Sequence, residues 1–118
     1  MIALALLCRN AKTLTRLTTP KWEVLGGNLT QSEPSVWKTG KWVMNYDRAM
    51  SLLGENLILV ESKDSSSYIG GTITGFNILE DKRVEITFQE DPEMFDRTEH
   101  KHLWRGSNPV CYLKGSLR

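Results

Sequence analysis

The sequence predicts an α+β protein that is mainly β, a small and partly closed β-barrel of five or six strands with one or two short helices. Three observations lead to this prediction. Short apolar or alternating runs are separated by turn residues, as is typical of strands. One central segment has helix signals at both ends, and glycines interrupt the longest alternating run. The length of 118 residues predicts a single domain over residues 1–118.

Five segments are predicted to be strands. Residues 2–8 form an apolar run too short to favour a helix, and residues 56–62 contain four consecutive apolar residues, which indicates burial on both faces. Residues 68–76 alternate and carry three glycines, which predicts a bulge, a bend or a close backbone contact. Residues 84–89 alternate as a half-buried antiparallel strand that follows, and residues 110–113 form a last short strand.

A short helix is predicted from about residue 46 to residue 53. Asn45 suits the N-cap because its side chain can accept a hydrogen bond from a free backbone amide one turn on. Asp47 would face the positive end of the helix dipole, and Gly54 supplies the left-handed residue that ends the helix. The apolar stripe of this helix comprises Ala49, Met50, Leu52 and Leu53.

Three further regions are predicted to be mostly irregular. Residues 9–21 are rich in Thr and basic residues, and Leu14 and Leu17 lie three apart, which allows a short helical turn. Residues 22–40 are dense in Gly, Pro, Asn and Ser and predict a long irregular connection. Such connections are uncommon inside compact domains and are often functional. Residues 90–109 leave the sheet and form acidic and then irregular segments.

The charge balance excludes a strongly basic nucleic-acid-binding protein, because fifteen Lys and Arg oppose fourteen Asp and Glu. Any binding to phosphate must therefore come from a local patch. Residues 8–48 carry seven basic and three acidic residues, whereas residues 80–99 carry eight acidic and three basic residues. This asymmetry predicts a basic side and an acidic side.

Cys8 and Cys111 lie near opposite ends of the chain and form no close-spaced pair. A disulfide would require the terminal strands to pair, and two buried, reduced thiols in a cytoplasmic protein are the favoured prediction. The apolar run at the start has no basic residues before it and, at about seven residues, lies at the bottom of the secretory range, so we predict a buried first strand and not a secretory signal. No apolar stretch approaches the roughly 20 residues that cross a bilayer, so no membrane partner is predicted.

The central segment also carries a family resemblance. The run begins with Trp37 and Gly40, continues through Gly54 and an apolar strand ending in Ser62, and closes at residues 69–71. Between these landmarks stand Asn45, Tyr46, Arg48 and Ala49. This pattern, over about 40 of the 118 residues, resembles the EVE branch of the PUA-like superfamily. The related ASCH branch has a Gly-x-Lys motif at about the place of Gly40 and Lys41.

The resemblance implies a PUA-like β-barrel with a pocket beside the short helix, and a ligand drawn from RNA, modified DNA bases or nucleosides. Two positions depart from the pattern. The glutamate that an ASCH-type hydrolase is expected to carry shortly after Lys41 is absent, and Val43 and Met44 stand there instead. Glu55 replaces the Asp that usually follows Gly54.

A protein that binds a base needs flat π surfaces, polar groups for the base edge and cations for phosphate. The sequence supplies these groups in and beside the predicted loops. The predicted ligand-binding residues are Trp37, Lys41, Trp42, Asn45, Tyr46, Arg48, Ser62 and Trp104. A purely structural interpretation stays open, because tryptophans in small domains mostly fill cores and Asn45 can serve as a helix cap alone.

The leading hypothesis is therefore a non-enzymatic module that binds RNA or DNA through an unpaired or modified base, or a nucleoside. The first alternative is an ASCH-type amidohydrolase acting on a modified nucleoside, with Lys41 as its working group. The second is a small protein-interaction domain from a mobile element. No cofactor and no metal are predicted: the His100 and His102 pair lacks convincing further ligands, and Lys101 between them would repel a cation.

Overall fold

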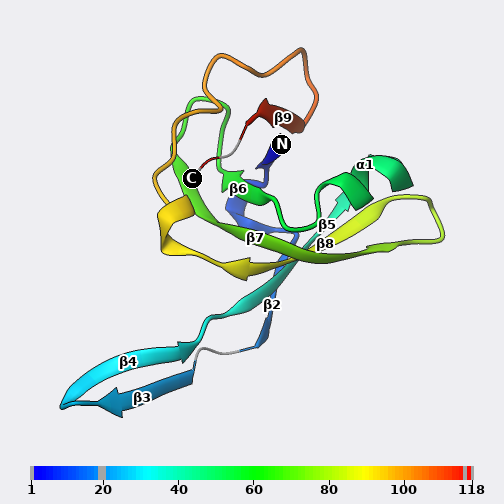
Figure 1. The fold of residues 1–118 in the computed structure, drawn as a ribbon. Coiled ribbons are helices and arrows are strands. Elements are labelled where there is room, and N and C mark those ends of the chain that lie inside the picture. Colours follow the sequence, from blue (N-terminus) through cyan, green and yellow to red (C-terminus); the bar gives the residue numbers. More distant parts are fainter. Residues whose placement is uncertain (1, 19–20, 116, 118) are drawn as a thin grey trace.

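The computed structural model describes residues 2–18, 21–115 and 117. Two sheets account for the nine strands of this part of the chain (Figure 1). The strands are β1 (Ile2–Leu7), β2 (Leu14–Thr18), β3 (Lys21–Leu25), β4 (Asn28–Glu33), β5 (Val36–Trp42), β6 (Asn56–Val60), β7 (Ser67–Ile78), β8 (Val84–Glu90) and β9 (Val110–Lys114). The helices are α1 (Tyr46–Ser51) and two short 3₁₀ helices, η1 (Arg9–Ala11) and η2 (Pro92–Met94).

Seven strands form one mixed sheet in the order β2-β5-β8-β7-β6-β1-β9, and β3 and β4 form a separate hairpin that projects from it (Figure 1). Strand β1 runs parallel to β6, and every other neighbouring pair is antiparallel. The prediction of a mainly β fold is confirmed. Among the described strands the sheet ends at β2 and β9 without closing, so the structure does not establish the predicted barrel.

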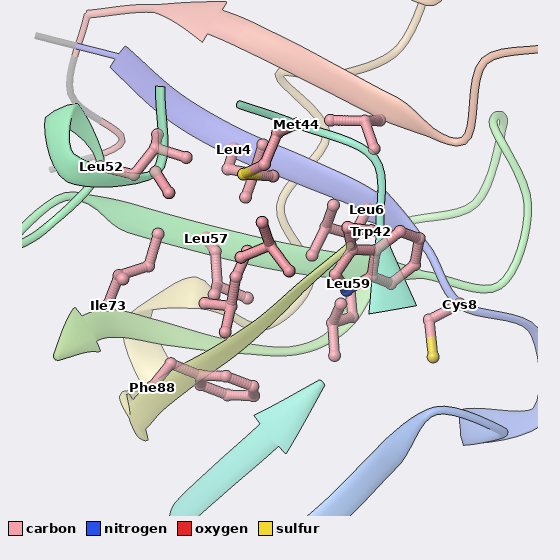
Figure 2. Close-up of a cluster of buried hydrophobic side chains, with 14 of the residues drawn as sticks. Leu4, Leu6, Cys8, Trp42, Met44, Leu52, Leu57, Leu59, Ile73 and Phe88 are labelled. Atoms are coloured by element: carbon pink, nitrogen blue, oxygen red, sulfur yellow. The ribbon is translucent and has the colours of Figure 1, made fainter. Parts of the chain in front are cut away.

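The core lies on both faces of the adjacent strands β1 and β6, as their continuous apolar sequences predict. Leu4, Leu6, Leu57 and Leu59 point into the larger cluster, which also contains Trp42 and Phe88 (Figure 2). The intervening residues Ala3, Ala5, Ile58 and Val60 pack on the other face with Met94, Cys111 and Leu113. Both faces are covered, and strands buried on two sides need no polar alternation.

The helix is placed as predicted but ends earlier, at Ser51. The Asn45 side chain accepts a hydrogen bond from the backbone N–H of Arg48 at 2.8 Å, which confirms the N-cap. Gly54 has a φ of +83°, which confirms the left-handed turn after the helix. The predicted apolar stripe divides: two of its residues, Ala49 and Leu52, are buried, whereas the other two, Met50 and Leu53, are exposed.

The predicted close contact at the glycines of β7 is confirmed. A Cβ on Gly71 would lie 1.8 Å from the carbonyl oxygen of Gln89, and one on Gly70 would lie 2.7 Å from the Cβ of Met94. Glycine is therefore required where β8 and η2 approach β7. The register of β7 against β8 also shifts between Ile73 and Gly75, which confirms a bulge.

Two predictions for the first third of the chain were wrong. Leu14 and Leu17 lie in strand β2 and not in a helical turn. Residues 22–40 are not a long irregular loop, because they contain most of β3, all of β4 and much of β5. Gly26 and Gly27, with φ of +57° and +83°, form the tight turn of the β3–β4 hairpin, since two residues of positive φ match the twist of its strands. The glycines that predicted an irregular connection therefore form the turn of a hairpin.

Cys8 and Cys111 are both buried and unbonded, as predicted. Within the described residues, no helix has the length and apolar character needed to span a membrane.

Candidate functional site

The structure distributes the predicted ligand-binding residues over several places. Trp37 lies within β5 and not in a loop, because this segment pairs with β2 and β8. Its Nε1 donates a hydrogen bond to Oε1 of Glu90 at 3.0 Å, and the guanidinium of Arg16 lies 4.6 Å from its ring centroid. The half-buried Trp37 indole therefore has a partner for its N–H group, Glu90, and a cation, Arg16, over its ring.

Trp42 ends β5 and is only 5% exposed, packed beside Leu6 and Leu59 in the larger core cluster (Figure 2). Its Nε1 donates to Oγ1 of Thr39 at 3.3 Å. A ring so deeply buried cannot offer a stacking face, although its edge can line a hollow. Lys41, the preceding residue, is exposed, and its Nζ lies 4.0 Å from Oδ2 of Asp81. Exposed ion pairs of this length contribute little stability.

The residues near the start of α1 face a shallow hollow of about 290 Å³. Asn45 and Arg48 line it with Asp47 and Ser51. The Asn45 oxygen is engaged in the helix cap, and the Arg48 guanidinium lies 4.5 Å from the ring centroid of Tyr112. Tyr46 is 56% exposed and meets Phe76 edge to face, with ring centroids 5.9 Å apart.

The last two predicted residues lie in loops on other parts of the molecule. The Ser62 hydroxyl is 2.6 Å from that of Ser65, within the turn between β6 and β7. Trp104 precedes β9 and packs against the smaller core cluster, edge to face with His100. His100 is fully buried, and its Nε2 lies 2.6 Å from the Ser65 carbonyl oxygen. The eight predicted residues therefore do not line one common pocket among the hollows described here.

Two of them, Lys41 and Trp42, do come together in a hollow of about 340 Å³ between the end of β1, η1 and the end of β5. We call it the basic hollow. Its more buried lining residues are Leu7, Cys8 and Trp42. Its exposed lining residues are Arg9, Lys12, Thr13 and Lys41, of which three are cations. Among the residues that the structure describes, no carboxylate lines this hollow.

A chain of polar contacts joins Cys8, Thr13 and Trp42 of the basic hollow to the buried Thr39. The Cys8 thiol lies 3.2 Å from the Thr13 hydroxyl, which lies 3.4 Å from the Thr39 hydroxyl. Thr39 in turn accepts the Trp42 indole N–H. These side chains connect the residue that follows β1 and the residue that precedes β2 to strand β5. The hydroxyls can exchange donor and acceptor roles. The hollow therefore combines an apolar base, adaptable hydroxyls and a cationic rim.

The geometry of the rim depends on a strained connection after β1. Asn10 and Ala11 both have positive φ, 57° and 52°, a conformation that asparagine tolerates better than most residues. The Asn10 backbone N–H donates to both carboxylate oxygens of Glu61, at 3.0 and 2.9 Å. On the other side, the Tyr68 hydroxyl donates to the Cys8 carbonyl oxygen at 2.6 Å. These contacts place Arg9 and Lys12 on the same side as Lys41.

Sequence reasoning missed Arg9, Lys12, Thr13 and Cys8 as site residues. A signal was present, because these residues belong to the basic segment from residue 8 to residue 48. What the pattern lacked was the turn at Asn10, which brings the segment back across the end of β5, where the backbone N–H of Gly40 donates to the Thr13 carbonyl oxygen at 3.3 Å.

Comparison of the chain with protein-family models, with curated proteins and with solved structures found no match. The resemblance to the EVE and ASCH branches therefore stays a prediction, and the site is interpreted from its own chemistry.

Proposed function

We propose that this chain is a nucleic-acid-binding module that holds one unpaired or modified base of RNA or DNA, or a free nucleotide, in the basic hollow. The observation that carries the proposal is the lining itself: three cations line a partly apolar hollow, and none of its described lining residues is a carboxylate. Cations at the mouth suit phosphate, and an apolar base with hydroxyls suits a nucleobase. The volume of about 340 Å³ falls within the range typical of small-ligand pockets.

The proposed binding mode differs from the pocket that the sequence predicts. Because Trp42 is 5% exposed, the base would contact the edge of its indole and the side chain of Leu7, and would not stack between aromatic walls. The Thr13 hydroxyl supplies a hydrogen bond to the base edge, and Arg9, Lys12 and Lys41 contact phosphate. A duplex would have to release the base at a cost of a few kcal/mol, so unpaired or weakened bases are preferred.

The amidohydrolase alternative has weaker support. A catalytic amine requires Lys41 to be desolvated so that its neutral form becomes accessible. The Lys41 side chain is 57% exposed, and the carboxylate of its ion-pair partner, Asp81, is exposed too. A cytoplasmic location for the binding module fits the two unbonded, buried thiols.

The test is a titration of labelled single-stranded RNA and DNA ten-mers, followed by fluorescence anisotropy at several salt concentrations. Each of Arg9→Ala, Lys12→Ala and Lys41→Ala should weaken binding to all sequences and reduce the salt slope by about 0.7. Lys114→Ala is the matched control, because this exposed cation lies at the end of β9 that pairs with Ile2, remote from Leu7. Thr13→Val should leave the salt slope unchanged and alter the preference among bases.

Two results would overturn the proposal. One is the absence of saturable binding to either ten-mer and to nucleoside monophosphates at low salt. The other is an equal loss of affinity in Lys114→Ala and in the three rim variants, which would show that net charge and not the basic hollow is responsible.

A further inference from the structure

Strand β9 is an edge strand with outward-facing backbone groups. Among the described strands it pairs with β1 alone (Figure 1). Leu4 lies opposite Tyr112, and Ala3 lies opposite Leu113. In the same register the Leu7 N–H donates to the Pro109 carbonyl oxygen at 2.8 Å. Since hydrogen-bonded and non-hydrogen-bonded pairs alternate in antiparallel strands, Cys111 and Leu113 direct their backbone groups toward β1. The backbone groups of Val110, Tyr112 and Lys114 therefore face away from the sheet.

One of these outward groups already has a side-chain partner. The Val110 N–H donates to Oδ1 of Asn108 at 3.0 Å, which places an amide oxygen where the carbonyl of a neighbouring strand would lie. This contact confirms the direction deduced from the register. No other described strand pairs with the outward groups of Tyr112 and Lys114. An unpaired strand edge is a template for a further strand.

A groove follows this edge. Two hollows, of about 220 and 430 Å³, share Leu103, Arg105 and Tyr112 as lining residues. The first extends to Val110 and the second to Lys114, so together they accompany β9 along its length. Leu103, on the loop that precedes β9, is 49% exposed. The groove therefore offers a backbone edge, an exposed apolar side chain and room for an extended chain.

The charges of the groove favour an acidic occupant. Arg105 and Lys114 line it, and neither has an ion pair within the described residues. Among the described lining residues the one carboxylate is that of Glu99, which is neutralised by Arg97, whose Nε donates to it at 2.9 Å. Two cations without carboxylate partners beside an open edge are complementary to carboxylates on an incoming strand.

The other edge of the sheet, β2, lacks these features. The register of β2 against β5 shifts between Arg16 and Thr18, and bulges of this kind protect edges against further pairing. The Thr18 hydroxyl also accepts the backbone N–H of Val36. The edge suited to strand addition is thus β9.

We propose that the groove along β9 binds an extended acidic segment of a partner protein, which adds to the sheet as a further strand. Its backbone pairs with the outward groups of Tyr112 and Lys114 and displaces the Asn108 side chain from Val110. Its carboxylates contact Arg105 and Lys114, and an apolar side chain packs on Leu103. Among the described residues, this groove shares no lining residue with the basic hollow, so each of the two proposals can be tested without the other.

The probe is an acetylated eight-residue peptide of alternating Val and Glu, titrated into the ¹⁵N-labelled full chain and followed by amide NMR. The amides of Val110, Tyr112 and Lys114 should shift, and those of Tyr112 and Lys114 should gain protection from hydrogen exchange. Arg105→Glu should weaken binding about tenfold or more, because it replaces an attractive charged contact with a repulsive one. Arg83→Glu, an equal charge change on the β7–β8 turn, is the matched control and should bind like the parent chain.

A second pair of probes separates strand addition from simple charge attraction. A peptide with N-methyl groups on alternate residues, which cannot form the backbone ladder, should bind at least tenfold more weakly, as should an alternating Val and Lys peptide. Binding that is insensitive to N-methylation, or no shift at the β9 amides, overturns the proposal. It is also overturned if these amides become protected without peptide as protein concentration rises, since the occupant would then be a second copy of the chain.

Discussion

The guanidinium of Arg48 lies over the ring of Tyr112, 4.5 Å from its centroid, and joins helix α1 to strand β9. Burial raises the pKa of Tyr112, and the positive charge of Arg48 opposes that effect. The sequence predicts Arg48 as a ligand-binding residue, whereas this contact gives its charge a partner within the protein. The Arg48 side chain therefore has a structural role that can be measured.

We expect a double-mutant cycle of Arg48→Met and Tyr112→Leu to give a coupling energy of about 0.5 to 1 kcal/mol. The methionine preserves the apolar stem, so the cycle isolates the cation–π contact. Urea unfolding of the four proteins provides the free energies. A coupling energy near zero would show that the Arg48 guanidinium and the Tyr112 ring do not interact appreciably in solution.

The two glycines of β7 that differ most in their surroundings give a second prediction. Gly71→Ala should destabilise the protein by about 3 kcal/mol or more, because its Cβ would lie 1.8 Å from the backbone oxygen of Gln89. Gly75→Ala is the matched control in the same strand, where a Cβ meets nothing within 4 Å. Its unfolding free energy should change by less than about 1 kcal/mol. Equal effects of the two variants would contradict the close approach of β8.

His100 predicts a pH dependence of stability. Burial lowers its pKa below 6.5, an effect that the Ser65 carbonyl and Glu99 oppose and Lys101 reinforces. The unfolded chain therefore binds a proton first as pH falls, so the free energy of unfolding should decrease from pH 6.5 down to the lower pKa of the folded state. The slope is at most about 1.4 kcal/mol per pH unit.

Chemical unfolding at pH 7.5 and 5.5 tests this prediction. His100→Gln should remove the loss between these two values, whereas the exposed His102→Asn should retain it. The carboxylate of Glu99, whose pKa the Arg97 hydrogen bond lowers from 4.5, contributes stability that is lost only at more acidic pH. Retention of the full loss in His100→Gln would assign it to another group.

Asn45 distinguishes the cap from a ligand contact. Asn45→Ala should lower the unfolding free energy by about 1 kcal/mol, because the Arg48 amide loses its acceptor, and Asn45→Asp should be nearly neutral. Neither variant should change oligonucleotide affinity, since Asn45 does not line the basic hollow. A loss of affinity in both variants would favour the pocket beside α1 that the sequence predicts.

Local patterns were sufficient for much of the fold. The apolar run of residues 57–60 and the glycines of β7 identified buried strands and a close contact, and Asn45 and Gly54 marked the helix boundaries. The strand pattern and the helix boundaries depend on nearest neighbours in the chain, whereas the partner in the close contact of Gly71, which is Gln89 of β8, is set by strand pairing. The same patterns were misread around Gly26 and Gly27, because residues that break a strand also form the tight turn between two strands.

The candidate site could be predicted only in part. Lys41 and Trp42 stood in the basic segment, but their contact with residues 7–13 depends on the parallel pairing of β1 with β6 and on the turn at Asn10. Conversely, Trp37 and Ser62, which lie close to the predicted helix in sequence, have partners of their own elsewhere. Sequence proximity does not report which side chains share a hollow.

The sequence by itself determined the mainly β class, the central buried strands, the capped helix and a local excess of positive charge, because each follows from periodicity, capping chemistry or composition. Only the tertiary structure decided which cations face one hollow and which strand edge stays open. Both properties arise from contacts between segments far apart in the chain, where long-range pairing and packing, and not local preference, set the geometry.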